Sequence, residues 1–352
     1  MNLRQFNPIK ILNHWRTLKL ILGGKNPPPI SCEIDPSNLC NHDCIWCMYH
    51  DFNKQNNVIM RRGIMFPMID ELGDGGVKSV TFTGGGEPLM NPLTTEALYM
   101  AKKKKMDVGL VTNGGLMDRD VCKAIVDTCT FLRVSLDAAT PDIHKLLHRP
   151  KNPKDDNFLR IIENVKLLIS LRKQQKAHVT IGIAFLVHSL NYHEIYKASK
   201  LVKDIGADYI QIRPAFIPSK RILERTWPAV QKLIDDSLQL NDDQFNVFPI
   251  LHRFDEIRRA DRTYKRCLAH ALLGVVGANA TLYLCCQLRG NPRFSFGSLG
   301  RGKSFFDIWR SQKRQDVIKH IDVDKCPPCR YNKYNELLDY LSDKIKPHKN
   351  FL

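Results

Sequence analysis

Residues 78–88 read KSVTFTGGGEP, a strand-like run that is followed directly by a glycine-rich turn. Within the run, the apolar residues Val80 and Phe82 alternate with serine and threonine. Successive side chains of a strand point to opposite faces, so this strand has one apolar face and one polar face. The apolar face is suited to packing beneath helices, and the polar face is suited to lining a wet cavity.

Similar strand-like runs recur along residues 30–214, and helical stretches such as Phe158–Arg172 and Glu194–Ile205 separate them. The expected strands are Ser31–Asp35, Lys78–Thr83, Asp107–Asn113, Phe131–Asp137, His178–Val187 and Asp208–Arg213. Strands that alternate with helices predict an α/β fold with a parallel sheet. Because the inner face is polar, we expect a partial (β/α)6 TIM-like barrel that holds a polar ligand. A sheet with one solvated face is the alternative.

The rest of the chain divides into three further parts. Residues 1–29 form a basic leader with a helical pattern over Ile9–Leu22, which we expect to pack on the domain, with a membrane-surface role as the alternative. Residues 215–265 read as a mostly helical bridge, with Trp227–Leu240 as its clearest helix. Residues 266–352 are expected to form a small cysteine-rich α+β module with a strand pair around Gly277–Cys286.

Composition limits the class of protein. Of the 352 residues, 43% are hydrophobic and 25% are charged, which is the balance of a folded globular chain. No apolar run is long enough for a transmembrane segment, and no secretory signal is evident. The formal charge of +17 favours acidic partners, namely phosphorylated small molecules, nucleic acid or an anionic membrane, although a basic solvated surface explains it equally well. No nucleic-acid-binding module is visible, so we expect no DNA partner.

Eleven cysteines are present, and eight of them fall into two groups. In a chain of this length without a secretory signal, clustered cysteines indicate metal or redox chemistry and a cytoplasmic location. The other three, Cys32, Cys122 and Cys129, lie on strand or helix patterns and are expected in the core.

The first group lies in Cys40-Asn41-His42-Asp43-Cys44-Ile45-Trp46-Cys47, a C-x3-C-x2-C motif just after the first expected strand. This position corresponds to the rim where barrel enzymes place their chemistry. Three thiolates can bind three irons of a cubane cluster and leave the fourth iron open, as a catalytic metal site requires. The alternative is a structural zinc site that is completed by His42 or by a distant ligand.

Together with three later motifs, this one resembles the signature of the radical SAM superfamily. The later motifs are Gly84-Gly85-Gly86-Glu87-Pro88, Thr112-Asn113-Gly114 and Ser135-Leu136-Asp137, which follow the second, third and fourth expected strands. The resemblance covers roughly residues 30–215 and implies a radical SAM core over 30–214.

The resemblance also implies a chemistry. Cys40, Cys44 and Cys47 would hold a [4Fe–4S] cluster whose open iron binds the amino and carboxylate groups of S-adenosylmethionine (SAM). An electron, delivered by a partner such as flavodoxin or ferredoxin, would cleave SAM to methionine and a 5′-deoxyadenosyl radical, which abstracts a substrate hydrogen. The residues expected to contact SAM are Trp46, Gly85, Gly86, Glu87, Pro88, Asn113, Ser135, Asp137 and Arg213. For the last three, an internal polar network is the alternative.

The second group is similar to the twitch or SPASM modules that follow many radical SAM cores. The resemblance implies a second [4Fe–4S] cluster, held by Cys267, Cys285, Cys326 and Cys329. Alanine replaces a glycine of the family's turn before Cys285, which leaves Cys285 and Cys286 both open as ligands, and we favour Cys285. The group holds too few cysteines for two auxiliary clusters, so the one-cluster version matches better. A structural zinc ribbon is the alternative.

Three functions remain open at this stage. The first is a radical SAM oxidoreductase or epimerase that acts on a polar small molecule such as a sugar, an aminocyclitol or a nucleotide. The second is a peptide-modifying maturase, which the short leader disfavours. The third is a non-catalytic metal-binding protein, which the intact motifs disfavour. Candidate catalytic residues are His148, Arg149 and Tyr209, on position alone.

Overall fold

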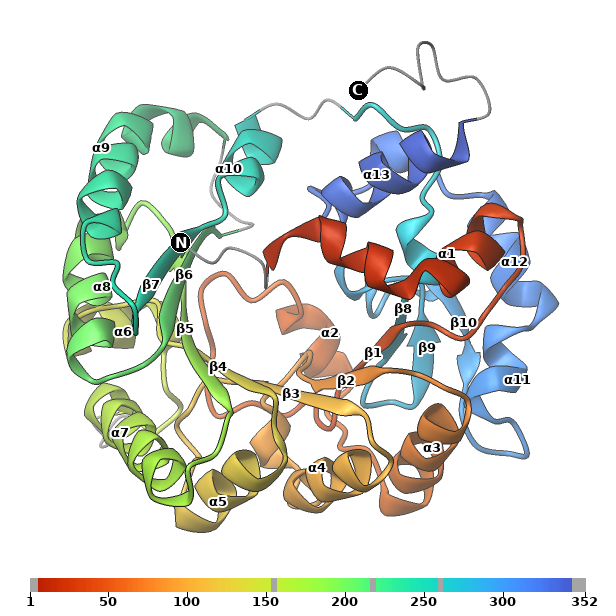
Figure 1. Ribbon diagram of the computed structural model, residues 1–352, viewed down its shortest axis with the longest axis horizontal. Coiled ribbons are helices and arrows are strands. Elements are labelled where there is room, and N and C mark those ends of the chain that lie inside the picture. The colour runs from red at the N-terminus through yellow and green to blue at the C-terminus, as the bar shows by residue number, and fades with distance from the viewer. Residues whose placement is uncertain (1–5, 153–156, 216–219, 259–261, 344–352) are drawn as a thin grey trace.

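The computed structural model describes residues 6–152, 157–215, 220–258 and 262–343. The two ends of the chain, and short parts of the expected core and bridge, therefore lie outside the described residues. The described residues form one ten-stranded sheet that curls around an interior, with helices along its outer side (Figure 1).

The sheet has the strand order β10-β9-β8-β1-β2-β3-β4-β5-β6-β7. Neighbours from β8 through β1 to β7 pair in parallel, and β9 and β10 are antiparallel. The strands are β1 (Ser31–Ile34), β2 (Ser79–Phe82), β3 (Asp107–Thr112), β4 (Phe131–Ser135), β5 (Thr180–Val187), β6 (Tyr209–Pro214), β7 (Asn246–Pro249), β8 (Leu273–Val276), β9 (Thr281–Tyr283) and β10 (Ser295–Ser298).

The helices connect these strands. They are α1 (Trp15–Leu22), α2 (His50–Gln55), α3 (Arg62–Asp74), α4 (Thr94–Lys103), α5 (Arg119–Thr128), α6 (Pro141–His148), α7 (Asn157–Gln175), α8 (Ile195–Asp204), α9 (Lys220–Leu238), α10 (Leu251–Arg258), α11 (Phe305–Trp309), α12 (Gln312–Lys319) and α13 (Asn332–Ser342). A 3-10 helix, η2 (Pro8–His14), precedes α1.

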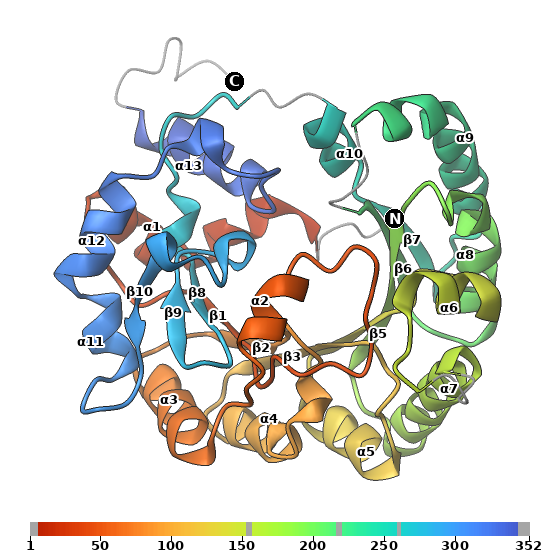
Figure 2. The same ribbon diagram turned by 180° about the vertical axis from the view of Figure 1, so that it is seen from behind.

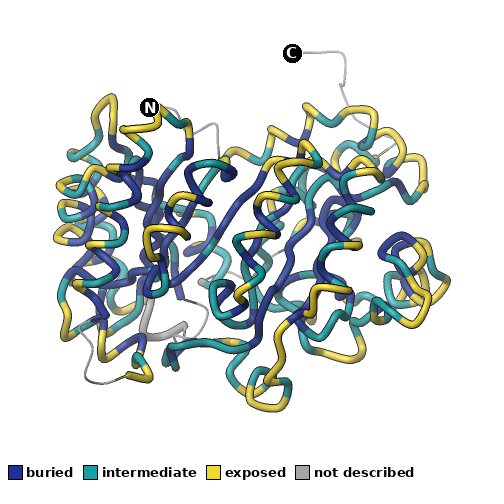
Figure 3. Tube along the Cα trace, turned by 90° about the horizontal axis from the view of Figure 1, so that it is seen from below, coloured by how far each residue is buried: buried dark blue, intermediate teal, exposed yellow. Residues whose placement is uncertain are grey.

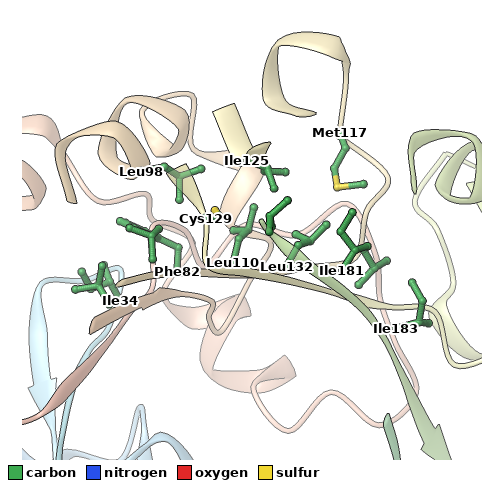
Figure 4. Packing of buried hydrophobic residues seen from close by; sticks show 14 of the residues in the cluster. Ile34, Phe82, Leu98, Leu110, Met117, Ile125, Cys129, Leu132, Ile181 and Ile183 are labelled. Atoms are coloured by element: carbon green, nitrogen blue, oxygen red, sulfur yellow. The ribbon is translucent and has the colours of Figure 1, made fainter. Parts of the chain in front are cut away.

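All six strands expected from the sequence are present, and they are parallel neighbours in chain order. The α/β class and the partial TIM-like barrel are thus confirmed. In β2, Val80 and Phe82 are fully buried whereas Ser79 and Thr81 are partly exposed, as the alternation predicted. The buried residues of β1 to β5 pack against α4 and α5 in the main core (Figure 4). In Figure 3 the strands run as buried segments, and the exposed residues lie mostly on the helices and loops around them.

The structure differs from the expectation in the bridge. Residues 215–265 contain not only α9 and α10 but also β7, which extends the barrel beside β6. Val247 of β7 joins the main core, and Phe248 turns to the inner face beside Tyr209. The strand was missed because it is only four residues long and begins with asparagine and ends with proline, two residues that are uncommon in strands.

The C-terminal part also differs from the expected separate module. Its strand β8 pairs in parallel with β1, so the barrel sheet continues into β9 and β10 without a break. The expected strand pair corresponds to β8 and β9, and it lies a few residues earlier in the chain than predicted.

The leader helix packs on the protein, as expected. Ile11 of η2, together with Leu18 and Ile21 of α1, is buried against Leu272 and against Leu338 of α13. Phe6 contacts Tyr209 and Phe248 with ring centroids 5.5 and 4.9 Å apart, and therefore lies at the end of the barrel where β6 begins. None of the helices in the described ranges is both long and apolar enough to cross a membrane.

Candidate functional site

The segment that carries the first three cysteines, residues 35–50, is called here the cysteine loop. It leaves the carboxyl end of β1 and leads into α2, which lies across this end of the barrel (Figure 2). Its backbone is held to the end of α6, because the amides of Asp43 and Ile45 donate to the carbonyls of His148 and Leu147, each at 3.0 Å. The loop therefore has a fixed position on the barrel rim.

The three thiols of the loop are partly buried and none is in a disulfide. Burial, with smaller contributions from Glu87, Cys44 and Cys47, raises the pKa of Cys40 to about 12. Cys44 and Cys47 line a surface depression, together with Arg149. Two of the three thiols thus line a depression on the rim, and Cys40 lies near enough to both for them to raise its pKa, so the donor set fits the expected cluster.

Residues 84–88, the glycine turn, follow β2 and contact the start of the cysteine loop. The amides of Gly86 and Glu87 donate to the carbonyls of Ser37 and Leu39 at 3.1 and 2.8 Å. A Cβ at Gly86 would lie 2.2 Å from the Leu39 carbonyl oxygen, and one at Gly85 would lie 2.9 Å from an Asn53 side-chain oxygen. Only glycine permits this close approach of two backbones.

Glu87 is 2% exposed and already serves the protein's own structure. Its carboxylate accepts hydrogen bonds from the Thr112 hydroxyl at 2.6 Å, the Asn113 amide at 2.8 Å and the Leu89 amide at 3.1 Å. Burial raises the pKa of this carboxyl, and the three donors oppose that rise. Glu87 therefore ties the glycine turn to the end of β3. Pro88, the next residue, is buried and begins a 3-10 turn.

Asn113 joins β3 to the cysteine loop. Its side-chain amide donates to the Asn41 side-chain oxygen at 2.7 Å and lies 4.0 Å from the Cys40 sulfur. The carboxyl ends of β1, β2 and β3 are thus linked through the cysteine loop, the glycine turn and Asn113. The sequence had placed these three motifs at the ends of successive strands.

Ser135, Asp137 and Arg213 lie at the carboxyl ends of β4 and β6, with different surroundings. The Ser135 hydroxyl has no hydrogen-bond partner among the described residues, and it is partly exposed. Asp137 is 1% exposed, and its carboxylate accepts from the Leu186 amide at 2.6 Å and faces the His148 Nε2 at 3.2 Å. Asp137 is therefore part of an internal network. Within the described part of the chain, Arg213 has no carboxylate partner, and burial lowers its pKa.

The three candidate catalytic residues do not form one site. His148 is 2% exposed, and its ring lies between Asp137 and Cys44. Arg149 is on the rim depression at a left-handed backbone position, with φ +44°. Tyr209 is at the first residue of β6, at the opposite end of the barrel from the cysteine loop, where its ring fills the space beside Gly182.

The sequence analysis largely missed a group of buried histidines in and beside the cysteine loop. It consists of His42, His144 and His148, all at most 4% exposed. The rings of His144 and His148 stack with centroids 4.5 Å apart, and the Trp46 ring lies edge-on to His148 at 5.7 Å. Burial lowers the pKa of His42 to about 3 and that of His144 to about 2. The sequence feature that could have revealed this group is the four-residue spacing of His144 and His148, which puts both on one helix face.

The second cysteine group converges on one enclosed pocket. Cys267, Cys285, Cys326 and Cys329 all line it, and most other lining residues are apolar. Burial raises the pKa of Cys267 to about 11, with a further contribution from Cys329. Arg262 donates to the carbonyls of Cys326 and Pro327, each at 2.8 Å, and so fixes the C-x2-C turn. The donor set and its enclosure fit a second cluster.

Cys285 and Cys286 point in different directions. Cys285 lines the pocket of the second cysteine group, whereas the Cys286 sulfur lies 3.9 Å from a guanidinium nitrogen of Arg330. Arg330 in turn faces the Glu33 carboxylate of β1 at 2.8 Å, and Arg289 lies 2.8 Å from Asp35 and 3.4 Å from Glu33. Sequence reasoning missed this ion network because its members are far apart in the chain.

Residues 34–202 match the family model of the radical SAM superfamily. Over these residues the chain matches the radical SAM domain that the motifs predicted. It is 27% identical over 195 residues to "Probable GTP 3',8-cyclase" of Methanocaldococcus jannaschii, covering 55% of this chain and 61% of that protein. Identity to the protein of the same name from Saccharolobus islandicus is 24% over 180 residues, covering 51% and 55%. The chain thus spans less than two thirds of the length of these relatives.

Solved structures resemble a larger part of the chain. "Native anSMEcpe with bound AdoMet" covers 83% of both chains with a TM-score of 0.62 and 18% identity. Streptococcus suis SuiB bound to the precursor peptide SuiA covers 90% of this chain and 72% of that chain, with a TM-score of 0.63 and 16% identity. At these identities the likeness is one of fold.

Proposed function

We propose that the protein is a radical SAM enzyme that cleaves SAM reductively and uses the resulting radical to abstract a hydrogen atom from a substrate. The observation that carries this proposal is the position of Cys40, Cys44 and Cys47 on the barrel rim beside the glycine turn. Backbone hydrogen bonds from the cysteine loop to the end of α6 hold them there. In the proposal these three thiolates hold a [4Fe–4S] cluster. When bound, the cluster supplies an electron to SAM, which then yields methionine and a 5′-deoxyadenosyl radical.

The chain's own residues position SAM. The bare backbone of Gly85 and Gly86 offers amide and carbonyl groups to its methionine part. Glu87 and Pro88 hold that turn, and Asn113 holds the cysteine loop next to it. Ser135 and Arg213 have polar groups without a protein partner in the described chain, so they are suited to bind the ribose and the carboxylate.

Two other expected SAM contacts change their roles in this proposal. Trp46 is 8% exposed and packs against His148, so its ring forms a wall of the site. Asp137 does not contact SAM in this proposal, because its carboxylate is engaged by His148 and by the amide of Leu186. His148 is then not a base for the substrate, because both of its ring nitrogens face protein atoms.

We propose a second [4Fe–4S] cluster at the second cysteine group, in a twitch- or SPASM-like segment. Its support is the convergence of Cys267, Cys285, Cys326 and Cys329 on one pocket, with Cys285 rather than Cys286 as the ligand. Four protein ligands leave no open iron, so such a cluster serves as an electron relay. A reductant such as flavodoxin or ferredoxin would supply electrons, and a reducing cytoplasm suits the free thiols.

The proposed reaction is oxidation or epimerisation of a polar, anionic small molecule, such as a nucleotide or a phosphorylated sugar. In the described residues, neither Arg133 on the inner face of β4 nor Arg213 has a carboxylate partner, and an anionic substrate would supply one. The curated relatives named for GTP favour a nucleotide. Peptide modification is the second candidate, because the fold matches SuiB, which was solved with a precursor peptide.

The test is SAM cleavage by the anaerobically reconstituted full-length chain with dithionite. We expect 5′-deoxyadenosine and methionine in equal amounts, and about eight irons per chain if each of the two clusters holds four. The Cys40→Ala variant should release neither product. Release of no 5′-deoxyadenosine by a chain that carries its iron would reject the proposal.

The second cluster has its own test. Cys285 lines the pocket and Cys286 does not. Cys285→Ser should therefore lower the bound iron to about half, since one of two cubane clusters is lost. The matched variant Cys286→Ser should keep the full iron content. Equal iron content in the two variants would contradict the assignment, and the electron paramagnetic resonance spectrum of the reduced protein shows which cluster remains.

A further inference from the structure

Two side chains of the cysteine loop and one of α6 bring their ligand atoms close together. The atoms come from His42, Cys44 and His148, and they all lie within 4.8 Å of one another. One of these contacts joins the Cys44 sulfur to the His148 Nδ1 at 3.3 Å. Two imidazoles and one thiolate at such spacing match the ligand types of zinc.

Asp137 orients His148 for this purpose. Its carboxylate lies 3.2 Å from the His148 Nε2, and the two side chains are 1% and 2% exposed. A carboxylate at Nε2 keeps a proton on that nitrogen, so Nδ1, which faces the Cys44 sulfur, is the ring nitrogen that can give up its proton and bind a metal. Histidines that bind metals are usually held in this way by a carboxylate behind the ring.

His42 supplies the second imidazole. It is 4% exposed, and neither ring nitrogen makes a hydrogen bond of ordinary geometry, although the Asn157 side chain lies near enough to raise the pKa of the ring. A buried imidazole that is so poorly paired is costly, so a ring nitrogen of His42 is available to a ligand beside the Cys44 thiol.

The three ligands are fixed before any metal arrives. His42 pairs with Pro150 in a β-bridge, and the amides of Asp43 and Ile45 bond to the end of the helix that carries His148. The site therefore needs little reorganisation to bind a metal ion.

We propose that the chain without its iron–sulfur cluster binds one zinc ion through His42, Cys44 and His148, with Asp137 supporting His148. Binding releases the one proton that the Cys44 sulfur and the His148 Nδ1 share, and a water molecule fills the open fourth position. Because this thiolate is also one of the three proposed cluster ligands, zinc and the cluster compete for it. The site is distinct from a zinc ion held by the three thiolates of the cysteine loop.

The experiment titrates zinc into full-length, metal-free and reduced protein that carries Cys326→Ser and Cys329→Ser, which disable the second cysteine group. Neither iron nor SAM is present, so failure of the proposed enzyme activity does not affect the outcome. We expect one zinc equivalent, which His42→Gln and His148→Gln abolish. The matched control His144→Gln should retain it, because His144 stacks on His148 but is outside the ligand group. Asp137→Asn should weaken zinc binding by about 10-fold or more.

Variants of the three loop cysteines distinguish this site from a zinc site made of three thiolates. Cys44→Ser should lose the zinc, whereas Cys40→Ser and Cys47→Ser should keep it. Loss of zinc in the Cys40 or Cys47 variant, or retention in both histidine variants, would overturn the proposal. The absorption spectrum of cobalt(II) bound to the protein without histidine substitutions is a second test, and it does not depend on how these variants fold. A cobalt spectrum with the charge-transfer intensity of one thiolate supports the site, and one with that of three rejects it.

Discussion

Gly86 shows how one residue sets the distance between two motifs. A Cβ there would lie 2.2 Å from the Leu39 carbonyl oxygen and 2.5 Å from the Asn38 carbonyl carbon, both in the backbone. Backbone atoms cannot turn aside as a flexible side chain can, so the two segments would have to separate.

We therefore expect Gly86→Ala to displace the cysteine loop, with a loss of about 1–3 kcal/mol in the free energy of unfolding. Reconstituted iron content should fall as well, because Cys40 follows directly after Leu39. Urea unfolding and an iron assay measure the two effects.

The matched control is Gly63→Ala in α3, where no atom lies within 4 Å of the added Cβ. That variant should gain up to about 1 kcal/mol from the higher helix propensity of alanine. Equal stability of the two variants would mean that the turn and the loop are not in tight contact.

At the scale of elements, α11 is positioned by a residue of α3. The Glu71 carboxylate accepts from the backbone amides of Phe305 and Phe306 at 2.7 and 2.9 Å, and so caps the first turn of α11 from another helix. Phe305 is fully buried and Trp309 is 1% exposed, and their rings stack with centroids 5.7 Å apart. A negative charge at a helix N-terminus is favourable.

Glu71→Ala should therefore destabilise the protein by about 1–3 kcal/mol, because two buried amides lose their acceptor. The comparison variant is Glu96→Ala, whose exposed ion pair with Arg62 contributes at most about 1 kcal/mol. Thermal unfolding of both variants measures the difference. A Glu71 variant as stable as the Glu96 variant would contradict the capping role.

For the whole molecule, Glu33 joins the C-terminal segment to the first barrel strand. It is 4% exposed and accepts ion pairs from Arg330 at 2.8 Å and from Arg289 at 3.4 Å. Burial raises its pKa, but Arg330, Arg289 and Arg133 outweigh burial and hold the pKa below its ordinary value of 4.5. The pairs thus reinforce the parallel pairing of β8 with β1.

Removing one member of a buried ion pair leaves the other charge unpaired, so Glu33→Gln should cost about 3–5 kcal/mol at pH 7. Because the pKa of Glu33 is lowered on folding, its stabilising contribution is present above pH 4.5 and is lost as the pH falls through the lowered pKa. The stability gap between the two proteins should therefore close in acid.

Urea unfolding across this pH range measures that gap. The control is Asp204→Asn, which removes an exposed ion pair with Lys200 and should cost no more than about 1 kcal/mol. A gap for Glu33→Gln that stays constant down to pH 3 would rule out Glu33 as the titrating group.

The sequence alone determined the parts whose physical cause is local. Strand alternation, as at Val80 and Phe82, follows from the two-residue period of a strand, and it sufficed to predict the parallel barrel. The cysteine loop and the glycine turn were found because each is a short contiguous motif next to a strand end. Parallel strands bring such ends to one edge, so the meeting of these two motifs was predictable as well.

Only the tertiary structure decided which groups already have partners. Glu87 and Asp137 were both expected to contact SAM. In the structure, the Glu87 carboxylate accepts three hydrogen bonds from the protein, and the Asp137 carboxylate contacts His148 and the Leu186 amide. The pairing of β8 with β1 and the contact between Cys44 and His148 join residues far apart in the chain. Such contacts depend on how the whole sheet curls, and no local periodicity encodes them.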